Sequence, residues 1–184
     1  MEVNILQNIQ AAKAGDKQAF ALLYKEFYTP LMRFVSYRLY DNEKAQDIVS
    51  DVFLKWYESL SRYEVKQKPL NYLYMIATRL IINESQKKKA EYFAEDVEEY
   101  LEDDSISAEE ILNTEIDISR IKEIINEELS ELEKSVILLK YIEEKENSEI
   151  AEILEIKENY LRQVEHRGLK KIKKKVEEKY NKNI

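Results

Sequence analysis

Glycine and proline are scarce in this chain, which has 184 residues but only two of each. Tight hairpin turns and glycine-rich phosphate loops need them, because glycine adopts positive φ angles and proline fixes the backbone of a turn. We therefore do not expect a β-sandwich or a doubly wound nucleotide-binding fold.

The side chains that usually perform catalysis or bind metals are also few. The chain has no cysteine and a single histidine, which excludes a disulfide framework, a thiolate zinc site and a cysteine nucleophile. Carboxylate pairs such as Glu143 and Glu144 fall on polar helix faces with no pocket-forming residues around them, so no acid–base catalyst is indicated. We expect a protein that is not an enzyme and that requires no metal and no cofactor.

The sequence gives no sign of export or of membrane insertion. Its first residues, MEVNILQNIQ, lack the basic start and apolar run of a signal sequence. No stretch approaches the roughly 18 apolar residues that a membrane-spanning helix needs. The sequence therefore predicts a cytoplasmic protein without membrane insertion.

Three segments of the first half repeat apolar residues at steps of three and four, which is the spacing of one helix face. They cover residues 20–34, 48–60 and 70–81. Pro69 suits the first turn of the third helix, because its missing N–H would have no intrahelical partner there. Trp56 is interpreted as a core residue. We predict a compact helical domain over residues 1–90.

Charge is distributed unevenly along a chain whose formal net charge is −8. Residues 1–90 hold 14 basic and 10 acidic side chains, residues 91–117 hold 12 acidic and no basic ones, and residues 157–184 hold 10 basic and 4 acidic ones. Like charges repel and extend a segment that has too few apolar residues to order it. We therefore place an acidic linker at residues 91–117 and a second domain at residues 118–184.

The second domain has the pattern of short helices that end in a helix-turn-helix. Ser130 and Glu133 have the spacing of a capping box, which predicts a helix start there. Further on, we expect a short apolar helix up to residue 154, a turn at residues 155–157 and then a longer helix. The predicted fold is therefore all-α, with two small helical domains joined by the acidic linker.

The outer face of the last helix carries side chains that suit DNA. Asparagine and glutamine can pair bidentately with adenine and arginine with guanine, whereas lysines bind phosphates without reading sequence. We predict that this helix binds DNA through Glu158, Asn159, Tyr160, Arg162, Gln163, Arg167 and Lys170. His166 is interpreted as an exposed helical side chain, because no other histidine or cysteine is present to form a site with it.

Four motifs follow one another over nearly the whole chain. They read AFALLYKEFYTPLMRFVSYRL, DNEKAQDIVSDVFLKWYESL, PLNYLYMIATRLIINESQKKK and LSELEKSVILLKYIEEKENSEIAEILEIKENYLRQVEHRGLKKI. In this order they resemble bacterial RNA polymerase sigma factors of the small extracytoplasmic-function (ECF) type. The first three are similar to the second conserved region of that family and the last to its fourth region. The resemblance implies a sigma factor that binds core polymerase, recognises two promoter elements and assists DNA melting.

The resemblance also assigns roles to individual residues. Those implied to bind the polymerase are Asp47, Ser50, Asp51 and Lys55. Those implied to recognise and melt the downstream promoter element are Arg62, Tyr63, Lys66, Arg79, Asn83, Gln86 and Lys87. The helix-turn-helix would read the upstream element. Expected partners are core RNA polymerase, promoter DNA and an anti-sigma protein, since such proteins commonly hold small sigma factors.

The sequence departs from the family pattern at several of these positions. Thr78-Arg79 stands where the family usually has Arg-Asn, and Asn83 stands where it has Asp. Glu155 replaces the glycine of the turn, and Lys157 replaces a Ser or Thr cap worth roughly 1 kcal/mol. The promoter bases therefore do not follow from the resemblance.

Two other functions are compatible with the same residues. A helix-turn-helix regulator would bind operator DNA as a homodimer without polymerase, at palindromic half-sites about one helical turn apart. A helical scaffold protein would have no DNA affinity in any context.

Overall fold

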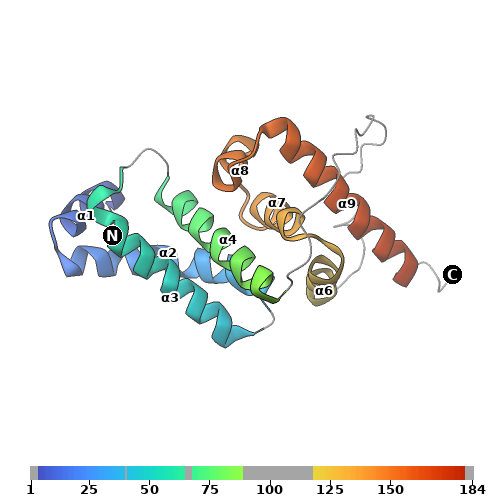
Figure 1. Ribbon diagram of the computed structural model, residues 1–184, viewed down its shortest axis with the longest axis horizontal. Helices are drawn as coiled ribbons and strands as arrows, with labels where there is room; N and C mark the ends of the chain where they lie inside the picture. Colours follow the sequence, from blue (N-terminus) through green and yellow to red (C-terminus); the bar gives the residue numbers. More distant parts are fainter. Residues whose placement is uncertain (1–3, 40, 65–67, 89–117, 181–184) are drawn as a thin grey trace. The chain divides into compact units, whose positions relative to one another are not determined.

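The computed structural model describes residues 4–39, 41–64, 68–88 and 118–180, and within these ranges it contains helices and no strand (Figure 1). The chain divides into two compact units, Met1–Lys87 and Lys88–Ile184. The predicted all-α class with two helical domains is confirmed. The predicted acidic linker, residues 91–117, lies outside the described residues.

In the first unit the helices are α1 (Ile5–Lys13), α2 (Lys17–Arg38), α3 (Asn42–Ser59), the short 3₁₀ helix η1 (Leu60–Arg62) and α4 (Pro69–Lys88). In the second unit they are α6 (Ile118–Glu128), α7 (Glu131–Tyr141), α8 (Asn147–Leu154) and α9 (Glu158–Tyr180). None of the described helices is both long enough and apolar enough to cross a membrane.

Polar side chains fix where the first three helices begin. Asn4, Asp16 and Asp41 precede α1, α2 and α3, and each accepts hydrogen bonds from backbone N–H groups of the first turn. These groups would otherwise have no intrahelical acceptor. The hydrogen bond from the backbone N–H of Lys44 lowers the pKa of Asp41 below its usual value.

Trp56 of α3 is the centre of an aromatic cluster that holds the first unit together. Its side chain is fully buried, and its ring centroid lies 5.7 Å from that of Phe20, 5.8 Å from Phe27 and 6.1 Å from Tyr63. The neighbours come from α2 and from the segment just after η1. The interpretation of Trp56 as a core residue is confirmed.

Helix α4 joins this core through two further ring contacts. Tyr74 is fully buried with its ring 5.0 Å from that of Phe34, and Tyr72 lies 5.0 Å from Tyr63. Pro69 is the first residue of α4, as predicted.

The second unit is built around α9, which packs against α6, α7 and α8. The capping box predicted for α7 is present, because the N–H of Glu133 donates to Ser130 Oγ (3.3 Å) and the N–H of Ser130 donates to Glu133 Oε2 (2.8 Å). Where α7 and α9 cross, Gly168 allows a close approach: a Cβ atom there would lie 3.2 Å from Cγ1 of Ile137, which is a tight contact.

We expect Trp56→Ala to lower the free energy of unfolding of the first unit by about 3–5 kcal/mol, because it removes a large buried side chain and leaves a cavity. Leu54→Ala is the matched control on the same helix, since Leu54 is 55% exposed and should change stability by no more than about 0.5 kcal/mol. Chemical denaturation followed by circular dichroism measures both. Equal losses in the two variants would contradict this account of the core.

Candidate DNA and polymerase interfaces

Helices α8 and α9 form the predicted helix-turn-helix. Helix α8 ends at Glu155, which adopts the left-handed conformation (φ 56°, ψ 40°), and α9 begins three residues later. Most residues other than glycine avoid this conformation because Cβ approaches the backbone carbonyl. Glu155 therefore performs the turn that a glycine would make without strain.

The residues predicted to read the upstream element all lie on α9. Glu158, Asn159, Arg162, Gln163 and Lys170 are exposed. Their spacing of three, four, seven and eight residues places them along one side of the helix. Their side chains are thus available together to a groove of DNA.

Tyr160 and Arg167, two further predicted DNA-binding residues, contact each other on the flank of this face. The guanidinium carbon of Arg167 lies 5.9 Å from the ring centroid of Tyr160, within the range of a cation–π interaction. The Nε atom of Arg167 is buried and has no hydrogen-bond partner among the described residues. Both side chains are partly buried, so they border the exposed face rather than form its centre.

His166 belongs to the same face, although it was predicted only as an exposed helical side chain without a role. It follows Arg162 by four residues and precedes Lys170 by four, and it is partly exposed. The signal was present in this i, i+4 spacing. We add His166 to the candidate DNA-contacting residues.

The lysine-rich end of α9 serves two purposes. Lys171 Nζ lies 2.8 Å from Oε2 of Glu133, whose side chain is only 3% exposed, and Lys175 Nζ lies 2.5 Å from Oε1 of Glu128. These two lysines tie α9 to α7 and α6, and the bond to Glu128 raises the pKa of Lys175. The side chain of Lys174 is 77% exposed and remains on the outer side.

Glu165 makes a third connection, in the half of α9 that carries Arg162 and Gln163. Its Oε1 accepts a hydrogen bond from the Tyr141 hydroxyl (2.5 Å) and its Oε2 lies 2.7 Å from Nζ of Lys140. Burial, together with this hydrogen bond, raises the pKa of Tyr141. Both carboxylate oxygens are thus paired with the C-terminal end of α7.

The residues predicted to bind the downstream promoter element fall into three groups: exposed residues, one buried residue, and residues whose side chains lie outside the described part of the chain. Arg62 is exposed in η1, and Arg79 and Asn83 are exposed one turn apart on α4. Lys66 and the side chains of Gln86 and Lys87 lie outside the described residues.

Tyr63 has a different position from the one that its predicted role requires. Its side chain is 7% exposed and packs edge-on against Trp56, with 84° between the ring planes. Burial raises the pKa of Tyr63 to about 12, and its backbone oxygen accepts a hydrogen bond from Lys13 Nζ (2.7 Å). In this conformation Tyr63 anchors the segment after η1 and does not offer its ring to a base.

The residues predicted to bind the polymerase form one exposed stripe on α3. Asp47, Ser50, Asp51 and Lys55 are all exposed, with Leu54 among them. The helical spacing brings them to the same side. The stripe therefore combines charges of both signs with a large apolar side chain.

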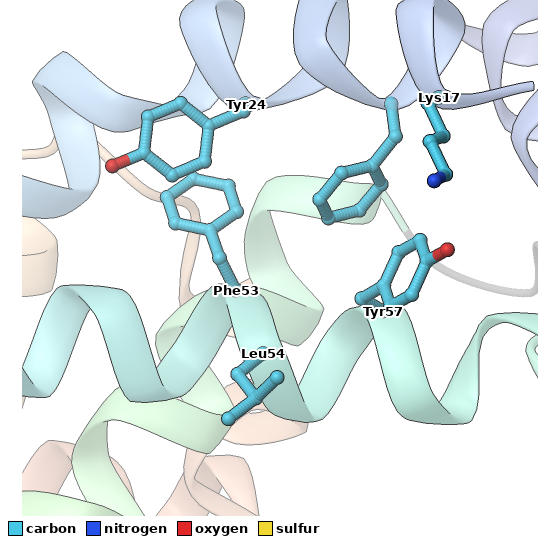
Figure 2. Close-up of a pocket in the computed structure, with 6 residues that line it drawn as sticks. Lys17, Tyr24, Phe53, Leu54 and Tyr57 are labelled. Carbon is cyan, nitrogen blue, oxygen red and sulfur yellow. The ribbon is translucent and has the colours of Figure 1, made fainter.

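An apolar groove lies next to this stripe, between α2 and α3. It has a volume of about 340 Å³ and is lined by Lys17, Phe20, Tyr24, Phe53, Leu54 and Tyr57. Figure 2 shows Tyr24 from α2 lying over Phe53 from α3, with Leu54 and Tyr57 further along α3; the Tyr24 and Phe53 ring centroids are 4.3 Å apart. This groove was not predicted from the sequence, although the apolar face of residues 48–60 is wider than packing on one helix needs.

Two family comparisons match the two units separately. Residues 23–91 match Sigma-70 region 2, and residues 127–174 match Sigma-70 region 4. The chain belongs to the sigma-70 family. As a sigma factor, it directs transcription initiation together with RNA polymerase.

Relatives place this sigma factor in the ECF group. It is 29% identical to the ECF RNA polymerase sigma factor SigW of Bacillus subtilis (strain 168), over 95% of this chain and 97% of SigW. The suspected resemblance to ECF sigma factors is confirmed.

Solved structures share the fold of this sigma factor. CnrH, in complex with the cytosolic domain of CnrY, is 16% identical with a TM-score of 0.69, covering 96% of this chain and 98% of CnrH. RpoE of Bartonella quintana, in complex with the anti-sigma factor NepR, is 16% identical with a TM-score of 0.63, covering 84% of this chain and 94% of RpoE.

The alternative of a plain helix-turn-helix regulator is not favoured. Such a protein needs only the second unit, whereas the first unit here matches region 2. The region 4 match covers α7 and α8 and continues along α9 as far as residue 174.

We expect Glu155→Gly to raise the free energy of unfolding of the second unit by about 1 kcal/mol, because glycine removes the strain of the left-handed conformation. Glu152→Gly is the matched control inside α8, where glycine should destabilise by about 1 kcal/mol. Thermal and chemical unfolding distinguish the two signs. Destabilisation by both variants would show that the Glu155 side chain contributes more than its backbone strain costs.

Proposed function

We propose that this sigma factor recognises two promoter elements, one with each unit, and helps to melt the DNA. The exposed side of α9 carries the upstream recognition, with Arg162 and Gln163 as base readers and Lys170 as a phosphate contact. The observation that carries this proposal is that guanine-, adenine- and phosphate-binding side chains share one exposed helix face.

For the downstream element, we propose Arg62, Arg79 and Asn83 as DNA contacts, joined by Lys66, Gln86 and Lys87. Opening a duplex requires cations along the separated strand and polar groups that bind an unstacked base. The exposure of Arg79 and Asn83 on consecutive turns of α4 supports this assignment. The buried Tyr63 holds the segment that leads to them.

Polymerase docking is proposed for the exposed stripe of α3 together with the apolar groove. Charged side chains at Asp47, Asp51 and Lys55 orient a partner, and burial of the exposed Leu54 and Tyr57 supplies affinity. The two features adjoin at Leu54 of α3, which belongs to the stripe and also lines the groove, so a single helical element of the polymerase can cover them.

The remaining expectations complete the proposal. The protein acts in the cytoplasm, where RNA polymerase is, and performs no chemistry of its own, because nucleotide addition belongs to the polymerase. An anti-sigma protein is proposed as a further partner, since RpoE of Bartonella quintana was solved with one. Such a partner would compete with polymerase for the α3 stripe.

Run-off transcription with core polymerase tests the assignment of α9. We expect Arg162→Ala and Gln163→Ala each to lower the preference for the selected upstream element over a scrambled one by about 1–3 kcal/mol per lost base contact. Lys174→Ala is the control: it should weaken DNA binding equally for both sequences and reduce the salt dependence by about one phosphate contact. Absence of any promoter-dependent product with the wild-type chain would reject the proposed function.

Binding to core polymerase tests the docking surface. We expect Leu54→Asp to weaken binding roughly tenfold or more, because it places a charge where apolar contact is needed. Leu22→Asp is the matched control, since Leu22 is 47% exposed on α2 but does not line the groove. Fluorescence anisotropy with labelled sigma factor measures both affinities. Equal effects of the two changes would contradict a docking role for the groove.

A further inference from the structure

Three of the polar contacts in the described part of the chain connect α9 to α6 and α7. Glu165 contacts Lys140 and Tyr141 at the end of α7. Lys171 contacts Glu133 at the start of α7, and Lys175 contacts Glu128 of α6. Only the first connection lies in the half of α9 that carries the proposed base readers. Its effect on DNA recognition therefore differs from that of the other two.

The buried apolar residues of α9 decide which side of the helix faces the rest of the unit, and directional contacts adjust its rotation more finely. At Gly168 the helix has no side chain to interlock with α7, and the backbone itself approaches Ile137. Apolar burial around this point is non-directional, whereas hydrogen bonds require a narrow range of distance and angle. Directional contacts near the reading face are thus the means of fixing how far α9 turns about its axis.

Glu165 is suited to this task because both of its oxygens are committed. The side chain of Glu165 is 14% exposed, and its oxygens lie 2.7 Å from Lys140 Nζ and 2.5 Å from the Tyr141 hydroxyl. Two hydrogen bonds to two different residues hold the direction of the carboxylate as well as its distance. Pairing with Lys140 also neutralises a negative charge that would otherwise face DNA phosphates beside Arg162.

We propose that Glu165, held by Tyr141 and Lys140, is a positioning residue for upstream promoter recognition. It acts through Arg162 and Gln163, by fixing the rotation of α9 that points them at the base edges. A rotation of about 10° moves side-chain atoms 5–6 Å from the helix axis by roughly 1 Å, which is enough to break hydrogen bonds to bases. The inference rests on the proposed function of α9.

The test uses the full chain bound to core polymerase and a DNA library randomised at the upstream element. Tyr141→Phe removes only the hydroxyl, and Glu165→Gln removes the charge. We expect each to reduce the ratio of transcription from selected to scrambled upstream elements roughly tenfold, while dependence on the downstream element stays unchanged. Lys140→Arg, which keeps the charge, should retain most of the ratio.

Glu128→Gln is the matched control, because it breaks the corresponding ion pair with Lys175 at the far end of α9. It should lower the melting temperature of the unit without changing the sequence ratio. If Glu165 has a purely structural role, Tyr141→Phe and Glu165→Gln will also lower the melting temperature and leave the sequence ratio unchanged. That outcome would overturn the inference. If Glu165→Gln does not fold, Tyr141→Phe decides, since its ring remains in place.

The two proposals fail in different ways. A wild-type chain that transcribes without preferring any upstream sequence would reject the reading role of α9 and the inference with it. A wild-type preference that survives in both Tyr141→Phe and Glu165→Gln would reject the positioning role alone.

Discussion

Helix α9 packs against the core of its unit with one side and exposes the other side to solvent. Its inner side buries Leu161, Val164, Ile172 and Val176 against α6, α7 and α8, whereas its outer side keeps polar and basic residues in solvent. A helix rotated by one residue would expose the first set and bury the second. The burial of a continuous apolar stripe thus determines which side chains the second unit can present to DNA.

The same division of labour occurs on α3 in the first unit. Val49, Val52 and Trp56 are fully buried, so the opposite side of the helix is left to Asp47, Asp51 and other exposed residues. The groove beside them arises because Phe20 and Tyr57, 4.9 Å apart, widen the aromatic face beyond what the core encloses. The stable core and the proposed docking surface therefore use adjoining parts of one aromatic cluster.

The sequence was sufficient to predict features that depend on residues close together in the chain. The helical stripes, the start of α4 at Pro69, the capping box at Ser130 and the turn before α9 depend on residues within a few positions of one another. Burial of Tyr63 and the pairing of Lys171 with Glu133 depend on residues from other helices, and in the second case the partners are 38 positions apart. No spacing rule within one helix reveals such pairs. The family resemblance therefore assigned Tyr63 to the DNA, and the pairing of Lys171 with Glu133 was not predicted.

The engagement of lysines within the unit affects how strongly region 4 can attract DNA. Residues 118–180 hold 14 basic and 15 acidic side chains, and Lys140, Lys171 and Lys175 are paired with glutamates inside the unit. Non-specific DNA affinity grows with the number of phosphates that cations neutralise, so a unit whose charges nearly balance and whose lysines are partly paired with its own glutamates gains less from this attraction. Attachment to polymerase compensates for this weak non-specific affinity, because it holds the unit at a high effective concentration near the promoter. The charge balance of the second unit thus makes base contacts by the outer side of α9 useful chiefly when a sigma factor is held by its polymerase.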